Sequence, residues 1–353
     1  MDAANQQVFE KTVARSEQEL VEHWLAQLET ALRSASRASV ASLFAPDGHW
    51  RDLLAFTWSL TPCQGAETIA ASMVAKQGNA KAREFAIAPG RTPPRRVQRA
   101  GIAVVEGIFR FETEIGRGFG VVRLLAAEPA KAFQLMTGLH ELKGFEEKIG
   151  KRRPAGAAIS RNFGGANWKE ERIAAQAYAD RDPVVLVAGG GQAGLSIAAT
   201  LGRLGVDTLV VDRHERVGDN WRKRYHSLAL HNGTEFNALP YLPFPPSWPT
   251  YMPKDMVADW FEAYAMAMEL NFWTGTELKS AAYDTAAARW DAVVRHADGT
   301  ERTVRPRHLI FANGLLGFPR MPDLPGLKDF VGAVIHSAEF SDGAHWRGKK
   351  ALV

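Results

Sequence analysis

The first 150 residues open with a helical spacing of apolar positions. Hydrophobic residues recur every three or four positions, at Val21, Trp24, Leu25, Leu28 and Leu32. This period predicts one amphipathic helix near the N-terminus, and a second, shorter helix is expected over residues 66–76.

The period then changes to two. Between residues 109 and 115, apolar or neutral positions alternate with charged ones, which predicts a half-buried strand. We expect Gly116–Gly118 to form a turn, and residues 119–125 and 131–139 to form two further strands. Helices followed by an antiparallel meander indicate an α+β domain over residues 1–150.

A third pattern starts with the run PVVLVA, which is short, apolar and unbroken, as in a strand that is covered on both faces. A helical segment over residues 195–204 and a second apolar strand over residues 206–211 follow. Strand, helix and strand in this order predict an α/β, Rossmann-type domain over residues 183–353. Residues 151–182 are interpreted as a linker that contains one helix, Trp168–Ala179.

A glycine-rich turn joins the first of these strands to its helix. Its sequence is Gly189-Gly190-Gly191-Gln192-Ala193-Gly194, which contains the spacing G-x-G-x-x-G. The first glycine allows the tight bend, the second lets a pyrophosphate approach the backbone, and the third lets the helix pack on the strand. The helix N-terminus offers free N–H groups to the phosphates. Asp212 lies 18 residues beyond Gly194, where a carboxylate accepts hydrogen bonds from ribose hydroxyls.

Composition narrows the function classes. The 353 residues are 46% hydrophobic and 23% charged, which suits a chain with two buried cores. The net charge is +4 and no nucleic-acid-binding motif accompanies it, so no nucleic-acid partner is expected. A polar N-terminus and the lack of a long apolar run predict a cytoplasmic protein that does not cross a membrane. Cys63 is the only cysteine, which excludes a disulfide framework, a zinc cluster and a CxxC redox pair; no metal site is expected.

The residues after Asp212 select the cofactor. The segment Gly218-Asp219-Asn220-Trp221, the segment Tyr225–His231 and the proline-rich stretch 239–254 occur in the order seen in flavin-containing monooxygenases. The chain resembles this family, which includes the YUCCA-type and Baeyer–Villiger enzymes. The first dinucleotide site of the family holds FAD. The resemblance therefore implies FAD contacts at Arg213, Gly218, Asn220, Trp221 and His231, in addition to the glycine-rich turn and Asp212.

Later segments extend the resemblance to residue 353. Asp298-Gly299 lies between two alternating segments and predicts a hairpin. A short apolar strand, residues 309–311, then leads into Ala312-Asn313-Gly314, which resembles the A-T-G signature of the family and implies a further FAD contact. Asn313 replaces the usual threonine, and because asparagine suits a tight turn, the backbone contact is expected to survive.

A histidine fingerprint follows this signature. Phe330, Gly332, His336 and Phe340 resemble the F-x-G-x-x-x-H-x-x-x-(Y/F/W) pattern of these monooxygenases. The terminal phenylalanine favours the enzymes that hydroxylate nitrogen or sulfur, or the YUCCA-type enzymes, over the Baeyer–Villiger group. His336 is thus a candidate catalytic residue; the alternative is a buried histidine bonded to backbone.

The resemblance also implies the reaction. NADPH reduces FAD in this family, and a C4a-(hydro)peroxyflavin in a water-poor pocket transfers one oxygen atom to the substrate. The expected cofactors are FAD and NAD(P)H, and the expected partners are a small-molecule substrate and molecular oxygen. Asn232, beside His231, is the candidate polar group near the flavin edge. The last residues, Gly348–Val353, predict the opening of a further parallel strand that leads to an NAD(P)H site in the family, so the sequence is interpreted as an incomplete two-dinucleotide-binding flavoprotein.

The N-terminal domain carries a separate resemblance. Its order of elements, with the segment LFAPDGHWRDLLAFTW, resembles the nuclear-transport-factor-like (SnoaL-like) cone fold over residues 18–145. Asp47, His49 and Asp52 are the candidates for an active site in the cone. The alternative, which we favour, makes them turn and rim residues of a non-catalytic domain. Cone domains of this type often dimerise, so a homodimer through this domain is an open expectation.

Two functions therefore remain. The first is a flavin-dependent monooxygenase, an oxidoreductase that hydroxylates nitrogen, sulfur or carbon of a small molecule. The second is a non-catalytic, flavin-binding or truncated protein whose cone domain mediates oligomerisation. A second glycine motif beyond Val353 would favour the first. A disulfide reductase shares the glycine fingerprint but needs two cysteines, and this chain has one.

Overall fold

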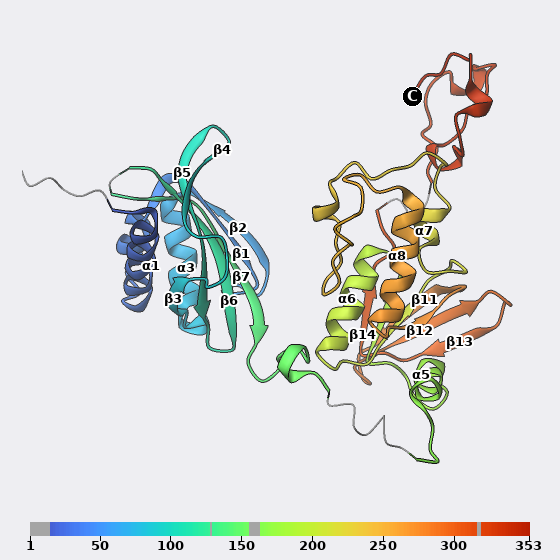
Figure 1. The fold of residues 1–353 in the computed structure, drawn as a ribbon, viewed down its shortest axis with the longest axis horizontal. Coiled ribbons are helices and arrows are strands. Elements are labelled where there is room, and N and C mark those ends of the chain that lie inside the picture. The colour runs from blue at the N-terminus through green and yellow to red at the C-terminus, as the bar shows by residue number, and fades with distance from the viewer. Residues whose placement is uncertain (1–14, 128, 155–162, 316–318) are drawn as a thin grey trace, which may run out of the picture. The chain divides into compact units, whose positions relative to one another are not determined.

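The structure is a computed structural model that describes residues 15–127, 129–154, 163–315 and 319–353. The chain divides into two compact units, Met1–Glu146 and Glu147–Val353 (Figure 1). Residues 155–162 of the predicted linker lie outside the described residues.

The N-terminal unit packs helices on one face of a curved, seven-stranded sheet (Figure 1). The helices are α1 (Glu17–Arg33), α2 (Arg37–Ser42) and α3 (Ala66–Ala80). The strands are β1 (Phe44–Leu53), β2 (Leu60–Gln64), β3 (Arg83–Ile87), β4 (Arg95–Arg99), β5 (Ile102–Glu112), β6 (Gly116–Leu125) and β7 (Ala132–Leu142). Their order is β2-β1-β7-β6-β5-β3, and β4 also pairs with β5. The pair β1–β7 is parallel and the other pairs are antiparallel.

The predicted N-terminal helix is confirmed as α1. Ser16 caps it, because its side chain accepts from the Glu19 N–H while the Glu19 carboxylate accepts from the Ser16 N–H. All five residues of the predicted apolar stripe are buried in the core of the unit. The second predicted helix is confirmed as α3, which continues to Ala80 and ends where Lys81 adopts a positive φ of 46°.

The predicted turn at Gly116–Gly118 is wrong. These residues begin β6, and the turn lies just before them, where the Thr113 N–H donates to the Gly116 carbonyl over 2.8 Å. The glycines serve packing: a Cβ on Gly118 would collide with the ring of Phe111, and one on Gly120 with the ring of Phe109. The predicted strands over 109–115, 119–125 and 131–139 are present with shifted ends.

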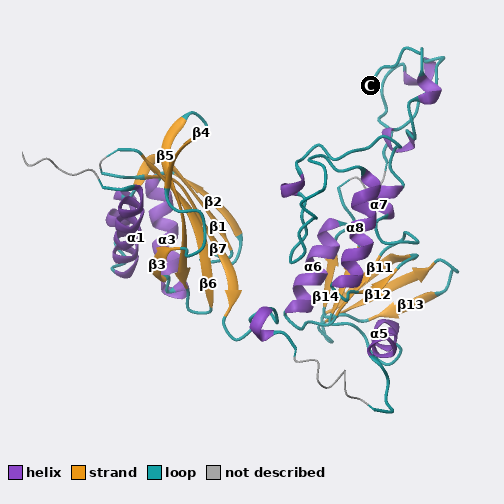
Figure 2. Cartoon of the chain, in the orientation of Figure 1, coloured by secondary structure: helices purple, strands orange, loops and turns teal. Residues whose placement is uncertain are grey.

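The C-terminal unit contains a parallel sheet and a separate antiparallel sheet (Figure 2). The parallel sheet has the order β10-β9-β8-β14, with β8 (Val185–Ala188), β9 (Thr208–Val211), β10 (Asn271–Trp273) and β14 (His308–Phe311). The antiparallel sheet contains β11 (Thr276–Asp284), β12 (Arg289–His296) and β13 (Glu301–Val304). The helices are α5 (Trp168–Ala177), α6 (Gln192–Arg203), α7 (Asp219–Arg222) and α8 (Lys254–Ala267). Short 3₁₀ helices lie at Gly150–Arg152, Thr234–Phe236, Leu327–Asp329, Ser337–Glu339 and Ala344–Trp346.

The parallel sheet is covered on both faces, as the unbroken apolar run predicts. Val185 and Val187 of β8 pack into a core with α6 and α8. Leu186 and Ala188 point the other way, into a core shared with the antiparallel sheet. Successive strand residues thus feed two cores, which is why all four residues of β8 are apolar and buried.

Most other predictions for this unit hold. The strand–helix–strand order is confirmed as β8, α6 and β9, and Gly205, with φ of 78°, ends the helix. The Asp298-Gly299 hairpin joins β12 to β13. The expected strand over residues 348–353 is wrong: residues 351–353 are exposed and pair with no described strand, and an unpaired strand has little stability. Within the described ranges, no helix has the length and apolar character needed to cross a bilayer.

Candidate dinucleotide site

The glycine-rich turn leaves β8 and enters α6 with no room for side chains at its first and last positions. Gly189 has φ of 111°, and a Cβ there would lie 2.5 Å from the carbonyl oxygen of Ala312. A Cβ on Gly194 would overlap the carbonyl oxygen of Gly189. The Ala312 N–H in turn donates to the Ala188 carbonyl over 2.7 Å. The predicted Ala312-Asn313-Gly314 segment therefore lies directly beside the turn.

Gly191 is the open position of the turn. Its backbone has φ of −82°, which any residue adopts, and a Cβ there would find only the Asn220 amide nitrogen, at 3.3 Å. Gly191 is also the N-cap of α6 and supplies no side-chain cap, so the first-turn N–H groups are left for an outside acceptor. This cradle beside free N–H groups fits a pyrophosphate.

Packing requires a glycine at position 190, for a reason that the fingerprint does not contain. A Cβ at this position would collide with the ring of Phe272 on β10. Its backbone N–H donates to Oδ2 of Asp212 over 2.6 Å. Gly190 thus ties the turn to the neighbouring strand and brings the turn and the acid into one site.

Asp212 ends β9 with its carboxylate already bonded. Oδ1 accepts from the backbone N–H of His214 at 2.8 Å and lies 2.7 Å from Nδ1 of the same residue. Burial raises the pKa of the Asp212 carboxyl, but hydrogen bonds from His214 and Gly190 outweigh this and leave the pKa below its ordinary value. The acid is therefore held ionised, as an acceptor for hydroxyl groups. No sequence pattern marks His214 as its partner.

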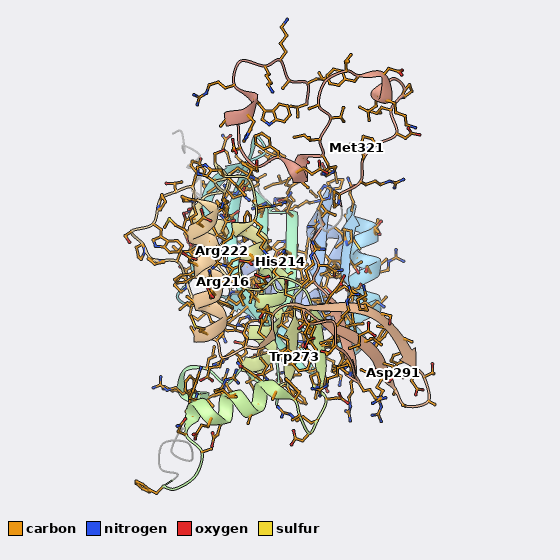
Figure 3. All side chains as sticks on the ribbon, turned by 90° about the vertical axis from the view of Figure 1, so that its right-hand side faces the viewer. His214, Arg216, Arg222, Trp273, Asp291 and Met321 are labelled. Atoms are coloured by element: carbon orange, nitrogen blue, oxygen red, sulfur yellow. The ribbon has the colours of Figure 1, made fainter. Side chains whose placement is uncertain are left out.

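The segment after Asp212 is fixed by ion pairs between α7 and α8. Arg222 contacts three carboxylates, at distances of 3.0 Å each, on Asp219, Asp259 and Glu262. Gly218, with φ of 90°, packs so closely on α8 that a Cβ would overlap the Ala258 carbonyl. Figure 3 labels His214, Arg216 and Arg222 on this segment. The network positions Asn220 beside Gly191.

The remaining predicted cofactor residues differ in exposure. Gln192 and Ala193 are exposed in the first turn of α6. Trp221 is half-buried, and its indole N–H has no partner within the described part of the chain. Arg213, His231, Asn313 and Gly314 are exposed. Gly218 alone is enclosed, and it serves the packing of α7 on α8 rather than presenting a group to a ligand.

The two candidate catalytic residues are bonded to backbone or turned to solvent. Nδ1 of His336 accepts the Ala338 N–H at 3.0 Å and caps a short 3₁₀ helix. Asn232 is exposed, and its carbonyl accepts from the Asn237 amide at 3.1 Å. His336 thus has the backbone bond of the alternative, but its side chain is half-buried rather than buried.

The three candidate site residues of the N-terminal unit also differ in exposure. Asp47 and His49 are exposed on β1, whereas Asp52 is fully buried. Oδ1 of Asp52 accepts from the Thr137 hydroxyl at 2.7 Å, and Oδ2 accepts from Phe56 N–H, Thr57 N–H and the Thr57 hydroxyl. Four hydrogen bonds satisfy this carboxylate, which is the pattern of a structural group.

A cavity of about 380 Å³ adjoins the first turn of α6. Helix α8 and the loop between α7 and α8 complete its wall. The lining residues are Gln192, Ala193, Ser196, Leu230, Phe236, Asn237, Ala238, Leu239, Phe244, Val257 and Phe261. Neither His336 nor Asn232 belongs to this lining. Ser196 and Asn237 are the polar lining residues that the sequence did not indicate.

The turn, the covered strands and the terminal acid together have the arrangement of a Rossmann-type α/β unit. Residues 183–353 match the model of the flavin-binding monooxygenase-like family. Over 172 residues the chain is 38% identical to indole-3-pyruvate monooxygenase YUCCA1 of Oryza sativa subsp. japonica, which covers 48% of this chain and 41% of that protein. The flavin-containing monooxygenase from Stenotrophomonas maltophilia is 28% identical, with a TM-score of 0.43 over 48% of this chain and 49% of that one. The chain thus spans about two fifths of the curated relative's length.

Proposed function

We propose that the C-terminal unit binds FAD and works as an FAD-dependent, NAD(P)H-using monooxygenase that oxygenates a small molecule with molecular oxygen. The observation that carries the proposal is the open cradle at Gly191, which the structure combines with the uncapped start of α6 and the ionised Asp212. The family match over residues 183–353 supports FAD as the dinucleotide.

Each group in the site has one task in this proposal. Gly191 and the first-turn N–H groups of α6 hold the pyrophosphate, and the Asn220 amide lies beside them as a further donor. Asp212 accepts ribose hydroxyls while the Gly190 N–H fixes its orientation. The exposed Asn313 and Gly314 extend the site on the β14 side. When bound, FAD supplies the redox chemistry, and the protein supplies binding, orientation and exclusion of water.

For the N-terminal unit we propose the nuclear-transport-factor-like cone fold without catalysis. The packing of helices on a curved sheet supports the fold, and the saturated carboxylate of Asp52 supports the non-catalytic reading. A homodimer through this unit and a cytoplasmic location both remain predictions. The oligomeric mass of the chain in solution tests the first of them.

An absorbance titration tests the main proposal. The purified chain, mixed with FAD and freed of excess by gel filtration, should retain a flavin spectrum, and anaerobic NADPH should bleach it. Retained flavin that NADPH does not bleach would favour the alternative of a non-catalytic flavin-binding protein. A folded chain that retains no FAD would overturn the proposal.

A further inference from the structure

We infer that His214 is a positioning residue that restricts Asp212 to one ribose hydroxyl, so that the site reads a single hydroxyl of the nucleotide rather than the 2′ and 3′ pair. The assignment deepens the proposed function and rests on it, because Asp212 is the acceptor for the ribose in that proposal. The observation behind it is the set of hydrogen bonds that already reach the Asp212 carboxylate.

His214 contacts Asp212 through both its backbone and its ring. The His214 N–H donates to Oδ1 of Asp212 over 2.8 Å, which closes a short turn of the Asx type. The His214 carbonyl accepts from the Gly275 N–H over 2.7 Å, so a second segment also holds this residue. Nδ1 of the ring then lies 2.7 Å from the same Oδ1. Both side chains are largely shielded from solvent, with 23% of His214 and 15% of Asp212 exposed.

Nδ1 of His214 carries a hydrogen in this contact. Burial raises the pKa of Asp212, but hydrogen bonds from His214 and Gly190 leave it below its ordinary value, so the carboxylate is ionised at neutral pH and only accepts. A separation of 2.7 Å between Nδ1 and Oδ1 therefore requires an N–H on the ring. The neutral imidazole with its hydrogen on Nδ1 and the imidazolium both supply this donor, so the contact persists in either charge state of His214.

Three hydrogen bonds from the described residues fill most of the Asp212 carboxylate. Oδ1 accepts two of them, from the backbone and the ring of His214. Oδ2 accepts one, from the Gly190 N–H over 2.6 Å. An ionised carboxylate has about four lone-pair sites, so one is left, on Oδ2. A ligand hydroxyl that donates to this site completes the carboxylate, and a second hydroxyl finds no acceptor on it.

The main chain of Asp212 is fixed on both sides. Its N–H donates to the Trp273 carbonyl over 3.0 Å, and its carbonyl accepts from the Thr276 N–H over 2.8 Å. The glycine-rich turn lies close by, because a Cβ on Gly190 would be 3.3 Å from the Cβ of Asp212. A short side chain on a fixed main chain has little freedom to leave its three donors. The fold therefore sets the number of open acceptor sites before a ligand binds.

The ligand that fits is a nucleoside diphosphate with one essential and one dispensable ribose hydroxyl. A hydrogen bond to a charged acceptor contributes more than one between neutral groups, so removal of the hydroxyl that is read should weaken binding about tenfold or more. The other hydroxyl has no partner on Asp212, and its removal should have little effect. A carboxylate with both oxygens open would accept both hydroxyls, and both removals would then weaken binding.

Three nucleotides test the inference on the full chain. Isothermal titration would measure the dissociation constants of ADP, 2′-deoxy-ADP and 3′-deoxy-ADP. One deoxy nucleotide should bind about tenfold more weakly than ADP or worse, and the other should bind within about threefold of ADP. Affinities of the two deoxy nucleotides within about threefold of each other would overturn the inference.

Two substitutions show whether His214 sets this pattern. His214→Ala removes the ring and opens a second lone-pair site, on Oδ1, so both deoxy nucleotides should bind at least about fivefold more weakly than ADP does to the same variant. His214→Asn keeps an amide N–H near the position of Nδ1 and should restore the difference between the two deoxy nucleotides. Circular dichroism and thermal melting check that both variants fold.

The ratio of affinities separates this role from a merely structural one. A structural role for His214 would weaken all three nucleotides in proportion and leave their ratios as in the parent chain. Unchanged ratios in folded His214→Ala would therefore overturn the inference.

ADP binding distinguishes this inference from the proposed function. A folded parent chain that binds neither ADP nor FAD would remove the FAD proposal, and the inference with it. Binding of ADP and FAD, with equal losses for the two deoxy nucleotides, would overturn the inference alone and leave the FAD proposal standing.

Discussion

The backbone N–H of Gly190 donates to Oδ2 of Asp212 over 2.6 Å, and this bond joins the glycine-rich turn to the end of the next strand. Two features that are 22 residues apart in sequence thereby form one surface. The bond also orients the carboxylate without occupying the cradle at Gly191. Binding of phosphate and of ribose can therefore be disturbed separately by substitution.

Gly191→Val should remove FAD binding and leave the fold intact. The backbone at this position is ordinary, and the one atom near a Cβ there is the Asn220 amide nitrogen at 3.3 Å. Valine therefore fits after a small shift of that side chain but fills the pyrophosphate path. We expect at least a 100-fold loss of FAD affinity by isothermal titration, with a melting temperature close to that of the parent. Unchanged FAD affinity would remove the phosphate-binding assignment.

Gly202→Ala is the matched control on the same helix. No atom lies within 4 Å of a Cβ at this position, so alanine meets no obstacle. Because alanine has a higher helix propensity, the variant should gain about 0.5 to 1 kcal/mol in unfolding free energy. Its FAD affinity should equal that of the parent chain.

Asp212→Asn should change both affinity and acid stability. The pKa of Asp212 is lowered in the folded chain, so its stabilisation is present above the ordinary value of 3.8 and is lost as pH falls through the folded-state pKa. The stability of the variant should not show this contribution to the loss at low pH. The variant should also bind FAD more weakly at pH 7. Identical denaturation midpoints of parent and variant from pH 7 down to pH 2 would contradict the role of the ionised carboxylate.

Glu106→Gln should destabilise the N-terminal unit. Hydrogen bonds from Arg99 lower the pKa of Glu106 to about 2 despite partial burial, and Arg123 adds to the effect. After a discount for solvent screening, we expect a loss of about 1 to 2 kcal/mol at pH 7. Amide hydrogen exchange measures this loss of stability, and exchange in β5 should be faster in the variant than in the parent chain. Glu114→Gln, at an exposed pair with Lys81, is the control and should leave exchange unchanged.

Gly118→Ala should destabilise β6, because its Cβ would collide with the ring of Phe111. The expected cost is about 1 to 3 kcal/mol, the range for overpacking. Phe111→Leu is destabilising alone through loss of ring packing, but it vacates the space above Gly118. The double variant should therefore lose less unfolding free energy than the two single variants lose together. A double-mutant cycle by urea unfolding measures the difference. Strict additivity would contradict the contact.

The dinucleotide unit was predictable because its signals are local. The signals lie within 30 residues: an apolar run, three glycines and a terminal acid. Each of them restricts the conformation of the backbone at its own position. The N-terminal sheet was harder to predict. Strand β1 turns Asp52 inward, so its buried face is not uniformly apolar, and its neighbour β7 pairs through residues more than 80 positions away.

The candidate site shows the same division. The turn and Asp212 follow from the fingerprint. The His214 contact, the lack of room for a side chain at Gly190 and the presence of Asn237 in the cavity lining depend on tertiary packing. The error at Gly116–Gly118 has this origin too. A glycine that makes room for a ring from a neighbouring strand has the same sequence signal as one that bends the chain.

The close approach of Gly189 and Ala312 also determines when the site can form during synthesis. The glycine-rich turn is encoded before residue 200, yet its first glycine packs against a backbone oxygen more than 120 positions later. A ribosome must therefore add most of the C-terminal unit before β14 can pair with β8. Until then the nascent chain carries the complete fingerprint without the assembled turn, so cofactor capture is expected to be a late event in its folding.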